Sequence, residues 1–449
     1  MDSFMVTLNP DKLLKEEFVS NLTGSSLLEI AALSTIFPLF FVLRRSVLST
    51  RSTDDVPNGL CAFLVIVIKE FFFTLFPIIL VLTVLSHWLY ACTIMLLLLV
   101  MLTNRFGPRD PWFSGSISHR DHLTSYRVIM TIMTCLCILA VDFRIFPRRF
   151  AKAEGYGSGF MDLGVGSFTL GNALVSLKAK GVSKGSWKAA IRFSIPLILL
   201  GISRLVSTRS VNYQVHVGEY GMHWNFFLTL AAVSILTSII NVPVKYSGIF
   251  GLSILVGYQS LLISGFNMYL LSDERGATII SQNKEGIFSI FGYWGLYLVG
   301  VWLGNYLFFE SGPSGFRSSN AAKTRVWSLS LMFWLVTVIL DRHIEKISRR
   351  MCNLSYVTLV LAENLQVLAI FMLSDSSKGS KLLKLEEAFN RNLLGLFLLA
   401  NLLTGLINLS LETLSASSLL SLFIVVTYAF TLSLVAGMAH YCGFRVKFW

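Results

Sequence analysis

The chain has 449 residues, of which 54% are hydrophobic and only 14% are charged, and its mean hydropathy is +0.67. A water-soluble core cannot bury that much apolar surface, so the composition excludes a soluble protein and indicates an integral membrane protein. The formal net charge of +12 comes from cations scattered along the chain. They suit contact with anionic lipid head groups and give no sign of nucleic-acid binding.

The repeating unit of the sequence is an apolar segment of about 20 residues bounded by charges, which is the length an α-helix needs to cross a bilayer. We therefore expect an all-α polytopic membrane protein, a bundle of about thirteen transmembrane helices. The polar residues 1–26 precede a single multi-helix transmembrane domain, residues 27–449. The predicted helices span 27–44, 59–80, 84–103, 125–143, 160–178, 187–206, 222–243, 246–266, 286–308, 325–341, 354–373, 391–410 and 417–438.

The distribution of Lys and Arg predicts the orientation of the bundle. Loops after odd-numbered helices lie on the same side as the C-terminus and carry the larger number of cations, so we predict a lumenal N-terminus and a cytosolic C-terminus. The loops after helices four, six, eight and ten then share the lumenal side, where their polar clusters can converge. One lumenal loop, DRHIEKISRR, breaks the charge bias, which suggests binding of a phosphorylated head group or anchoring by snorkelling side chains.

The first polar cluster is VDFRIFPRRFAK, at the lumenal end of the fourth predicted helix. Partial burial would raise the pKa of Asp142, and the cations Arg148, Arg149 and Lys152 would lower it. A carboxylate between those influences can act as a general base toward a hydroxyl, and Pro147 ends the helix so that the chain can bring Lys152 back toward Asp142. A structural salt bridge at the helix end explains the same residues equally well.

The second cluster, HVGEYGMHWNFF, leads into the seventh predicted helix from the same side. If residues 219–227 are helical, Glu219 and His223 are neighbours on one face and can form an acid–base or hydrogen-bonded pair. Trp224 fits an aromatic interfacial belt, whereas Asn225 and the ionisable groups need another explanation. No carboxylate–histidine spacing typical of a metal site recurs elsewhere, so we expect no metal.

Two further clusters hold side-chain amides. Asn283 precedes the ninth predicted helix, where it can cap that helix or hold a head group. In the twelfth predicted helix Asn401, Thr404, Gly405 and Asn408 recur at steps of three and four residues, so they form one stripe. Such a stripe usually packs against a neighbouring helix, with the amides as interhelical hydrogen bonds. A polar mouth over an apolar bundle nevertheless suits an enzyme that joins a lipid tail to a hydroxyl.

Several stretches resemble the GPI inositol acyltransferases, the class W proteins of glycosylphosphatidylinositol biosynthesis. The resemblance runs from about residue 15 to the end of the chain, with the motifs in the same order. It is carried by EEFVSNLTGSSLLEI, ILAVDFRIFPRRFAKAEGYGSGFMDLGVGSF, YQVHVGEYGMHWNFF, NKEGIFSIFGY, ISRRMCNLSY and LLANLLTGLINLS.

The resemblance implies a multi-pass enzyme of the endoplasmic reticulum membrane. Such an enzyme moves a fatty acyl chain, usually palmitoyl, from acyl-CoA to the inositol 2-hydroxyl of glucosaminyl-phosphatidylinositol. Acyl-CoA is then a co-substrate, no separate cofactor is needed, membrane lipids surround the protein, and no obligate protein partner is evident. The family motif VDFPxFPRRFAK falls on residues 141–152, so its catalytic Asp and Lys match Asp142 and Lys152. Arg144 stands where Pro is usual, which leaves the geometry of that turn open.

The mechanism we expect is direct transfer, because no nucleophile–base–orienter set argues for an acyl-enzyme. Asp142 accepts the proton of the inositol hydroxyl, whose oxygen attacks the thioester, and Lys152 stabilises the oxyanion or holds the donor. Because acyl-CoA is made on the cytosolic side, either the bundle admits it from that side or the predicted orientation is reversed. The residues expected to bind substrate are Arg148, Arg149, Glu219, His223, Trp224, Asn225, Asn283, Asn401 and Asn408.

Two rival hypotheses remain open at this point. A transporter or flippase for an anionic lipid would also have many helices, intramembrane amides and a basic vestibule, although no inverted repeat is evident. An acyltransferase of the membrane-bound O-acyltransferase type would use a buried His as its base, and His223 is the candidate for that role.

Overall fold

The computed structural model describes residues 17–18, 20–49, 59–106, 119–182, 187–210, 217–309, 319–373 and 382–445. Over these ranges the chain is almost entirely helical and contains no β-strand, as the sequence predicted. Isolated bridges between residues 24 and 158 and between residues 157 and 348 are the only strand-like pairings in the described residues.

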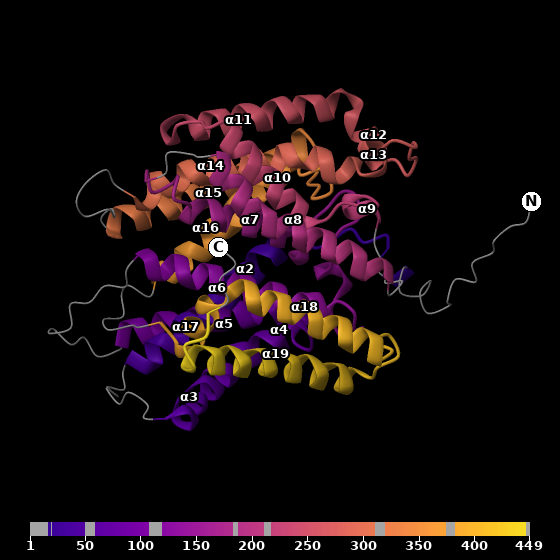
Figure 1. Ribbon diagram of the computed structural model, residues 1–449. Coiled ribbons are helices and arrows are strands. Elements are labelled where there is room, and N and C mark those ends of the chain that lie inside the picture. Colours follow the sequence, from indigo (N-terminus) through magenta and orange to yellow (C-terminus); the bar gives the residue numbers. More distant parts are fainter. Residues whose placement is uncertain are drawn as a thin grey trace, which may run out of the picture.

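The helices form a central layer with a group on either side of it (Figure 1). The centre contains α2 (Leu27–Ser49), α6 (His119–Ala140) and α16 (Leu354–Phe371). One flanking group contains α3 (Leu60–Phe73), α4 (Leu75–Leu82), α5 (Leu89–Phe106), α17 (Lys384–Arg391), α18 (Leu393–Ser410) and α19 (Ser418–Tyr441). The other contains α7 (Leu163–Val175), α8 (Trp187–Ser210), α9 (Val217–Tyr220), α10 (Phe226–Ile239), α11 (Val244–Leu261), α12 (Asn267–Leu271), α13 (Ile279–Gln282), α14 (Lys284–Phe308) and α15 (Ser319–His343).

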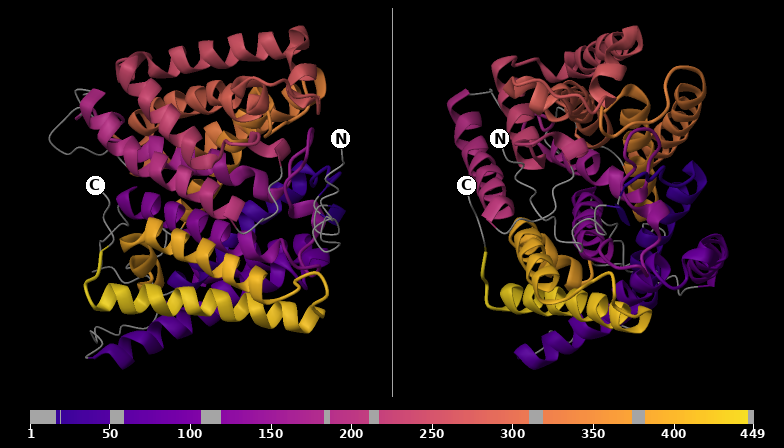
Figure 2. Two further views of the ribbon diagram at one scale, coloured as in Figure 1. Left: turned by 45° about the vertical axis from the view of Figure 1, so that its right-hand side comes forward. Right: turned by 90° about the vertical axis from the view of Figure 1, so that its right-hand side faces the viewer.

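Short irregular turns complete the described chain. Three are 3₁₀ turns: η1 (Ser86–Trp88), η2 (Arg148–Phe150) and η3 (Phe160–Asp162); η4 (Leu262–Phe266) is a π-helical turn that joins α11 to α12. Figure 2 shows the flanking groups from other directions, with α3 and α19 at one edge of the molecule and α11 at the opposite edge.

Each of the thirteen predicted segments coincides with a helix. In the described residues, 10 helices are long and apolar enough to cross a membrane by length and composition. The predicted segments 160–178, 187–206 and 222–243 correspond instead to shorter apolar helices, Phe160–Val175, Ser194–Val206 and Phe226–Ile239. The polytopic all-α fold is therefore confirmed, while the number of crossings and the orientation stay predictions.

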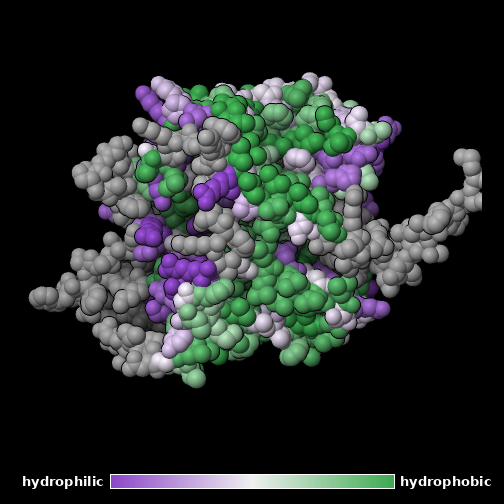
Figure 3. Space-filling model, in the orientation of Figure 1, coloured by the Kyte–Doolittle hydropathy of each residue, from purple (hydrophilic) through white to green (hydrophobic). Residues whose placement is uncertain are grey.

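The central helix α16 is the most buried of the candidate spans, and it packs against α2, α6, α7 and α15. Its sequence is apolar on every side, which is typical of a helix surrounded by other helices. Its polar groups have partners inside the bundle: Tyr126 of α6 donates to Asn364 Oδ1 at 2.7 Å, and Ser34 of α2 donates to Glu363 at 3.1 Å. Figure 3 shows the outer surface, where hydrophobic residues cover the helices and hydrophilic residues gather toward the ends.

The loops predicted to converge do meet at one end of the bundle (Figure 1). Backbone hydrogen bonds join Gly157 to Ile347 at 2.8 Å, Ser25 to Ser158 at 3.0 Å and Met222 to Gln282 at 3.1 Å. Loops that lie far apart in the sequence therefore form one connected layer above the helices.

The opposite end of the bundle is fastened by the short helix α17. Arg45 of α2 forms an ion pair with Glu386 of α17, and both side chains are fully buried. Glu70 of α3 accepts hydrogen bonds from two N–H groups at the start of α17, at 3.2 and 2.7 Å. Because the first N–H groups of a helix have no partner inside it, this carboxylate serves as a cap supplied by another helix.

We predict that Glu386→Ala destabilises the protein strongly, because it leaves the Arg45 guanidinium buried without its counter-charge. Breaking a buried pair from one side costs about 3–5 kcal/mol of unfolding free energy. The matched control is Glu387→Ala on the same helix, where a partly exposed pair with Lys384 is lost at a cost below about 1 kcal/mol. Thermal unfolding in detergent measures both variants, and equal shifts would contradict the assignment.

Candidate active site

The loop between α6 and α7 begins with a turn held together by Arg148. Its Nη2 donates to the carbonyl oxygens of Val141 at 2.7 Å and Phe146 at 3.1 Å, and its guanidinium lies 4.0 Å from the centre of the Phe18 ring. Burial lowers the pKa of Arg148 to about 10, and the nearby Asp142 opposes that shift. Arg148 therefore supports the turn that presents Asp142.

Asp142 is half-buried just beyond the end of α6. Its Oδ2 accepts a hydrogen bond of 2.7 Å from Nδ2 of Asn408, 266 residues further along the chain in α18. Arg148 adds an electrostatic interaction from the same loop. Two residues that the sequence placed in separate clusters thus meet at one point.

Lys152 binds the second polar cluster. Its Nζ donates to both carboxylate oxygens of Glu219 in α9, at 2.9 Å each. The lysine side chain is 38% exposed and the glutamate 20%, so this ion pair lies at the surface of the loop layer. The structure therefore gives Lys152 a carboxylate partner from a different loop, which sequence spacing could not identify.

Arg149 forms an ion pair with the first turn of α2. Its Nε lies 2.9 Å from Oε1 of Glu29 in α2, and its Nη2 donates to the carbonyl oxygen of Ser86 at 3.1 Å. Both side chains of the ion pair are partly exposed. The expected contacts of Arg148 and Arg149 with a substrate phosphate stay predictions, and both guanidinium groups also hold protein groups together.

Behind Lys152 lies a buried ion pair between Asp162 of η3 and Arg349. Arg349 Nε donates to Asp162 Oδ1 at 2.6 Å, and the other oxygen accepts from the backbone N–H groups of Ala153 and Gly159 at 2.9 and 2.7 Å. Burial by itself would lower the pKa of Arg349, but Glu219 and Asp162 outweigh it and raise that pKa well above its usual range. The charges of Lys152, Glu219, Arg349 and Asp162 therefore alternate in sign from the surface to the core.

Asp162 and Arg349 were not among the expected site residues. The sequence signal for Arg349 was the loop DRHIEKISRR. Its cations lie on the predicted lumenal side, where the distribution of Lys and Arg predicts few of them. The structure explains two of them, because Arg349 and Arg350 are buried and pair with Asp162 and Glu285. Neither head-group binding nor surface anchoring describes these two arginines.

The expected helical pair of Glu219 and His223 is wrong. Helix α9 ends at Tyr220, and Gly221 has a φ of +104°, which interrupts the helix before His223. A Cβ at Gly221 would lie 2.5 Å from the Cα of Asn283, so both the backbone angle and the close approach require glycine here. Glu219 and His223 therefore do not share a helical face.

The next two residues of this cluster serve the start of α10. Asn225 is its N-cap: Oδ1 accepts from two N–H groups of the first turn at 3.1 and 3.3 Å, and Nδ2 donates to the carbonyl oxygen of Gly201 in α8 at 2.9 Å. Trp224 donates from Nε1 to Thr229 at 2.9 Å, and its ring closely approaches Gly286 of α14. Both side chains have structural partners, and their expected contacts with substrate stay predictions.

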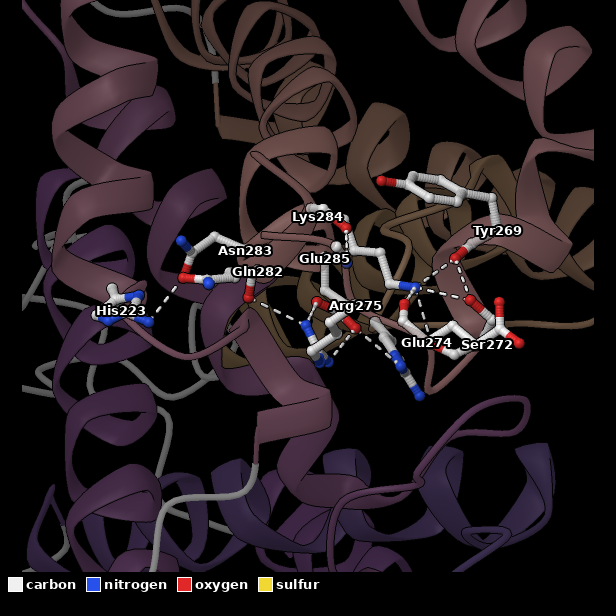
Figure 4. Close-up of polar contacts among 12 residues, drawn as sticks. His223, Tyr269, Ser272, Glu274, Arg275, Gln282, Asn283, Lys284 and Glu285 are labelled. Atoms are coloured by element: carbon white, nitrogen blue, oxygen red, sulfur yellow. Dashed lines mark hydrogen bonds and ion pairs between the residues drawn. The ribbon is translucent and has the colours of Figure 1, made fainter. Parts of the chain in front are cut away.

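Residues 283–285 hold three loops against the start of α14 (Figure 4). Asn283 accepts the backbone N–H of His223 at 2.7 Å through Oδ1 rather than capping α14 with its side chain. Glu285 pairs with Arg275 at 2.7 Å and with Arg350 at 2.8 Å. Lys284 is fully buried, and its Nζ donates to four oxygens at 2.7–3.0 Å, from Tyr269 O, Ser272 O, Ser272 Oγ and Glu274 O.

At membrane depth, α6 and α7 each leave one face incompletely covered, and we name these two faces together the open face. Thr134 of α6 and Gly164 of α7 adjoin within it, because a Cβ on Gly164 would lie 3.9 Å from Thr134 Oγ1. The partly exposed residues of α6 recur every three or four positions: Thr124, Arg127, Met130, Thr134 and Ile138. On α7 the same spacing holds for partly exposed Gly164, Val165 and Phe168 and for exposed Asn172.

Helix α18 lies beside α6 (Figure 1). Phe397 contacts the ring of Phe168 in α7 at 5.9 Å, and Asn408 reaches Asp142. Asn401 and Gly405 lie between them on the same side of α18, yet Asn401 is exposed and Gly405 has no atom within 4 Å of its would-be Cβ. Open space therefore lies beside the middle of this side of α18.

The stripe on α18 packs against neighbouring helices only in part, because Thr404 is buried whereas Asn401 is exposed. Asn401 donates to the carbonyl oxygen of Phe397 in its own helix at 2.8 Å rather than to a neighbouring helix. Asn408 reaches a loop carboxylate.

Comparisons with known proteins show what the chain is similar to. The family model described as GWT1 matches residues 11–439. An uncharacterized protein of Arabidopsis thaliana is 54% identical over 385 residues, which cover 85% of this chain and 88% of the relative. The phosphatidylinositol-glycan biosynthesis class W protein of Dictyostelium discoideum is 33% identical over 490 residues, 97% of this chain and 98% of the relative. The mouse protein named glucosaminyl-phosphatidylinositol-acyltransferase PIGW is 34% identical over 394 residues, 81% and 77% of the two chains.

We predict that Gly221→Ala lowers both the thermal stability and the activity of the protein, because a methyl group there meets the Asn283 backbone. The matched control is Gly265→Ala: Gly265 has a similar φ of +106° but no atom within 4 Å of its would-be Cβ. The control isolates the conformational cost, about 1 kcal/mol of unfolding free energy. Equal losses of stability in detergent would show that the contact with Asn283 is unimportant.

Proposed function

The chain belongs to the GWT1 family, and on this premise we propose that it is the acyltransferase that acylates the inositol of glucosaminyl-phosphatidylinositol in GPI-anchor biosynthesis. The acyl donor is acyl-CoA, the transferred chain is palmitoyl, and the enzyme works in the endoplasmic reticulum membrane. The observation that carries the proposal is the position of Asp142: it lies half-buried where the open face of α6 and α7 reaches the layer of polar loops.

Asp142 is the general base in this proposal. Its carboxylate accepts the proton of the inositol 2-hydroxyl as that oxygen attacks the thioester carbonyl carbon, and a tetrahedral oxyanion forms. When the intermediate collapses, the C–S bond breaks and the proton passes from Asp142 to the departing CoA sulfur. The hydroxyl oxygen gains the acyl group, the thiol is released, and the enzyme returns to its starting state.

Lys152 stabilises the oxyanion. A lysine ammonium has three N–H donors, so it can hold Glu219 and donate to the carbonyl oxygen of the thioester at the same time. The ion pair at 2.9 Å fixes the ammonium in place before the reaction, and pre-set charges are the most effective way to stabilise a developing oxyanion.

The open face is the binding site of the acyl chain in this proposal. Its apolar residues, and the aromatic contact between Phe168 and Phe397, suit a hydrocarbon tail at membrane depth. The face extends along α6 from Arg127 to Asp142, about 22 Å at 1.5 Å per residue.

We predict that Asp142→Asn lowers kcat by about 10²–10⁴-fold, because the amide cannot accept the hydroxyl proton. Lys152→Ala lowers kcat by about 10²–10³-fold, because the oxyanion loses its charge partner. The measurement is transfer from labelled palmitoyl-CoA to glucosaminyl-phosphatidylinositol by purified protein.

The control for this experiment is Arg144→Ala, which removes an exposed cation two residues from Asp142. It should change kcat far less than Asp142→Asn. The variant His223→Gln tests the rival scheme: a larger loss there than in Asp142→Asn would make His223 the base and would contradict the role given to Asp142.

A further inference from the structure

The hydrogen bond that the Asn408 amide donates is unusual for an asparagine in a membrane helix. Asn401, two turns earlier in α18, donates to the carbonyl oxygen four residues before it, as polar side chains in such helices commonly do. Asn408 instead turns its Nδ2 away from its own helix and donates to Asp142 Oδ2 at 2.7 Å. The contact joins the wall of the open face to the proposed base.

We propose that Asn408 is a positioning residue for Asp142. It holds Oδ2, so that Oδ1 is directed toward the hydroxyl that gives up its proton. This inference rests on the proposed function, and it replaces the expectation that Asn408 itself binds substrate.

The surroundings of Asp142 show why a separate positioning group is needed. Asp142 follows the last turn of α6, so the helix does not fix its carboxylate. Arg148 supplies positive charge nearby, but its hydrogen bonds run to backbone oxygens such as those of Val141 and Phe146. The hydrogen bond from Asn408 to Oδ2 therefore restrains the rotation of the carboxylate from a rigid helix. A misplacement of about 1 Å can cost a reaction 10²-fold in rate.

The same side of α18 also borders open space beside Gly405. Phe397 contacts Phe168 at one end of this stretch and Asn408 contacts Asp142 at the other, 11 positions later in the sequence. One rigid helix therefore carries both a wall of the proposed acyl-chain site and the donor that orients the base. Placing the positioning group on a helix rather than on a loop keeps the geometry well defined.

A hydrogen bond to the carboxylate form also affects how activity depends on pH. The amide stabilises ionised Asp142, so its loss favours the protonated form, which cannot act as a base. The other charged groups on the elements around Asp142 contribute a constant background in this comparison; they are Arg144, Arg148, Arg149, Lys152, Glu154 and Asp162 in its own loop, Glu29 of α2, Glu219 of α9 and Glu412 after α18.

The test is the pH dependence of kcat and KM for acyl transfer by purified full-length protein. Asn408→Leu keeps the approximate shape but removes the donor. We expect kcat to fall about 10–100-fold, KM for glucosaminyl-phosphatidylinositol to change less than about threefold, and the acid limb of the profile to move up by about one pH unit. Asn408→Asp places a second carboxylate beside the first, so its acid limb should move further in the same direction.

The matched control is Ser410→Ala, in the same last turn of α18, where an exposed hydroxyl donates to its own helix at 2.8 Å. It should leave kcat and the pH profile as they are. A loss of kcat in Asn408→Leu without movement of the acid limb would assign Asn408 a purely structural role and overturn the inference. Full activity in that variant would overturn it as well. Absence of transfer by the unmodified protein, in an assay that works with the mouse relative, would instead contradict the proposed function.

Discussion

The buried ion pair between Arg349 and Asp162 is the interaction on which the catalytic end of the molecule depends. It joins the loop after α15 to the loop after α6, which contains both Asp142 and Lys152. Desolvating two charges is costly unless hydrogen bonds satisfy them, and here two backbone N–H groups complete the shell of Asp162. The loop is therefore held by its own backbone as well as by a distant arginine, and it presents its polar residues in a fixed arrangement.

From this pair, charges of alternating sign lead outward to the reacting groups. Glu219 lies between buried Arg349 and partly exposed Lys152, and it interacts with both. A second set of contacts, around residues 283–285, places the loop that follows α9. Asp142 is fixed separately, by Asn408 from α18. The proposed base, Asp142, and the proposed oxyanion partner, Lys152, thus come from one loop but are secured by different helices.

The sequence predicted the polytopic helical fold because apolar segments of membrane length are a strong and local signal. It also predicted that the loops after alternate helices meet, since this follows from parity alone. The family resemblance predicted Asp142 and Lys152 as the catalytic residues, and these roles stay predictions. The partners of these residues could not be predicted: Asn408 is 266 positions from Asp142, and Glu219 is 67 positions from Lys152. Such pairs depend on how helices pack, which a single sequence does not encode in its spacing.

Other expectations failed for local reasons that are clear in hindsight. Gly221 adopts a positive φ and ends α9, so the helical pair of Glu219 and His223 does not form. Arg349 and Arg350 were expected to be surface cations. Both instead form ion pairs with buried carboxylates, those of Asp162 and Glu285. Asn401 and Gly405 looked like packing residues and instead border open space. In each case the residue type was informative, and its partner decided the role.

The central claim is that the acyl donor lies along the open face with its thioester between Asp142 and Lys152. The most direct test is an experimental structure with a non-transferable thioether analogue of palmitoyl-CoA. The account predicts a hydrocarbon tail between α6, α7 and α18, and a carbonyl oxygen within about 3.5 Å of Lys152 Nζ. A tail on the outer surface of the bundle, or a carbonyl group remote from both residues, would contradict it.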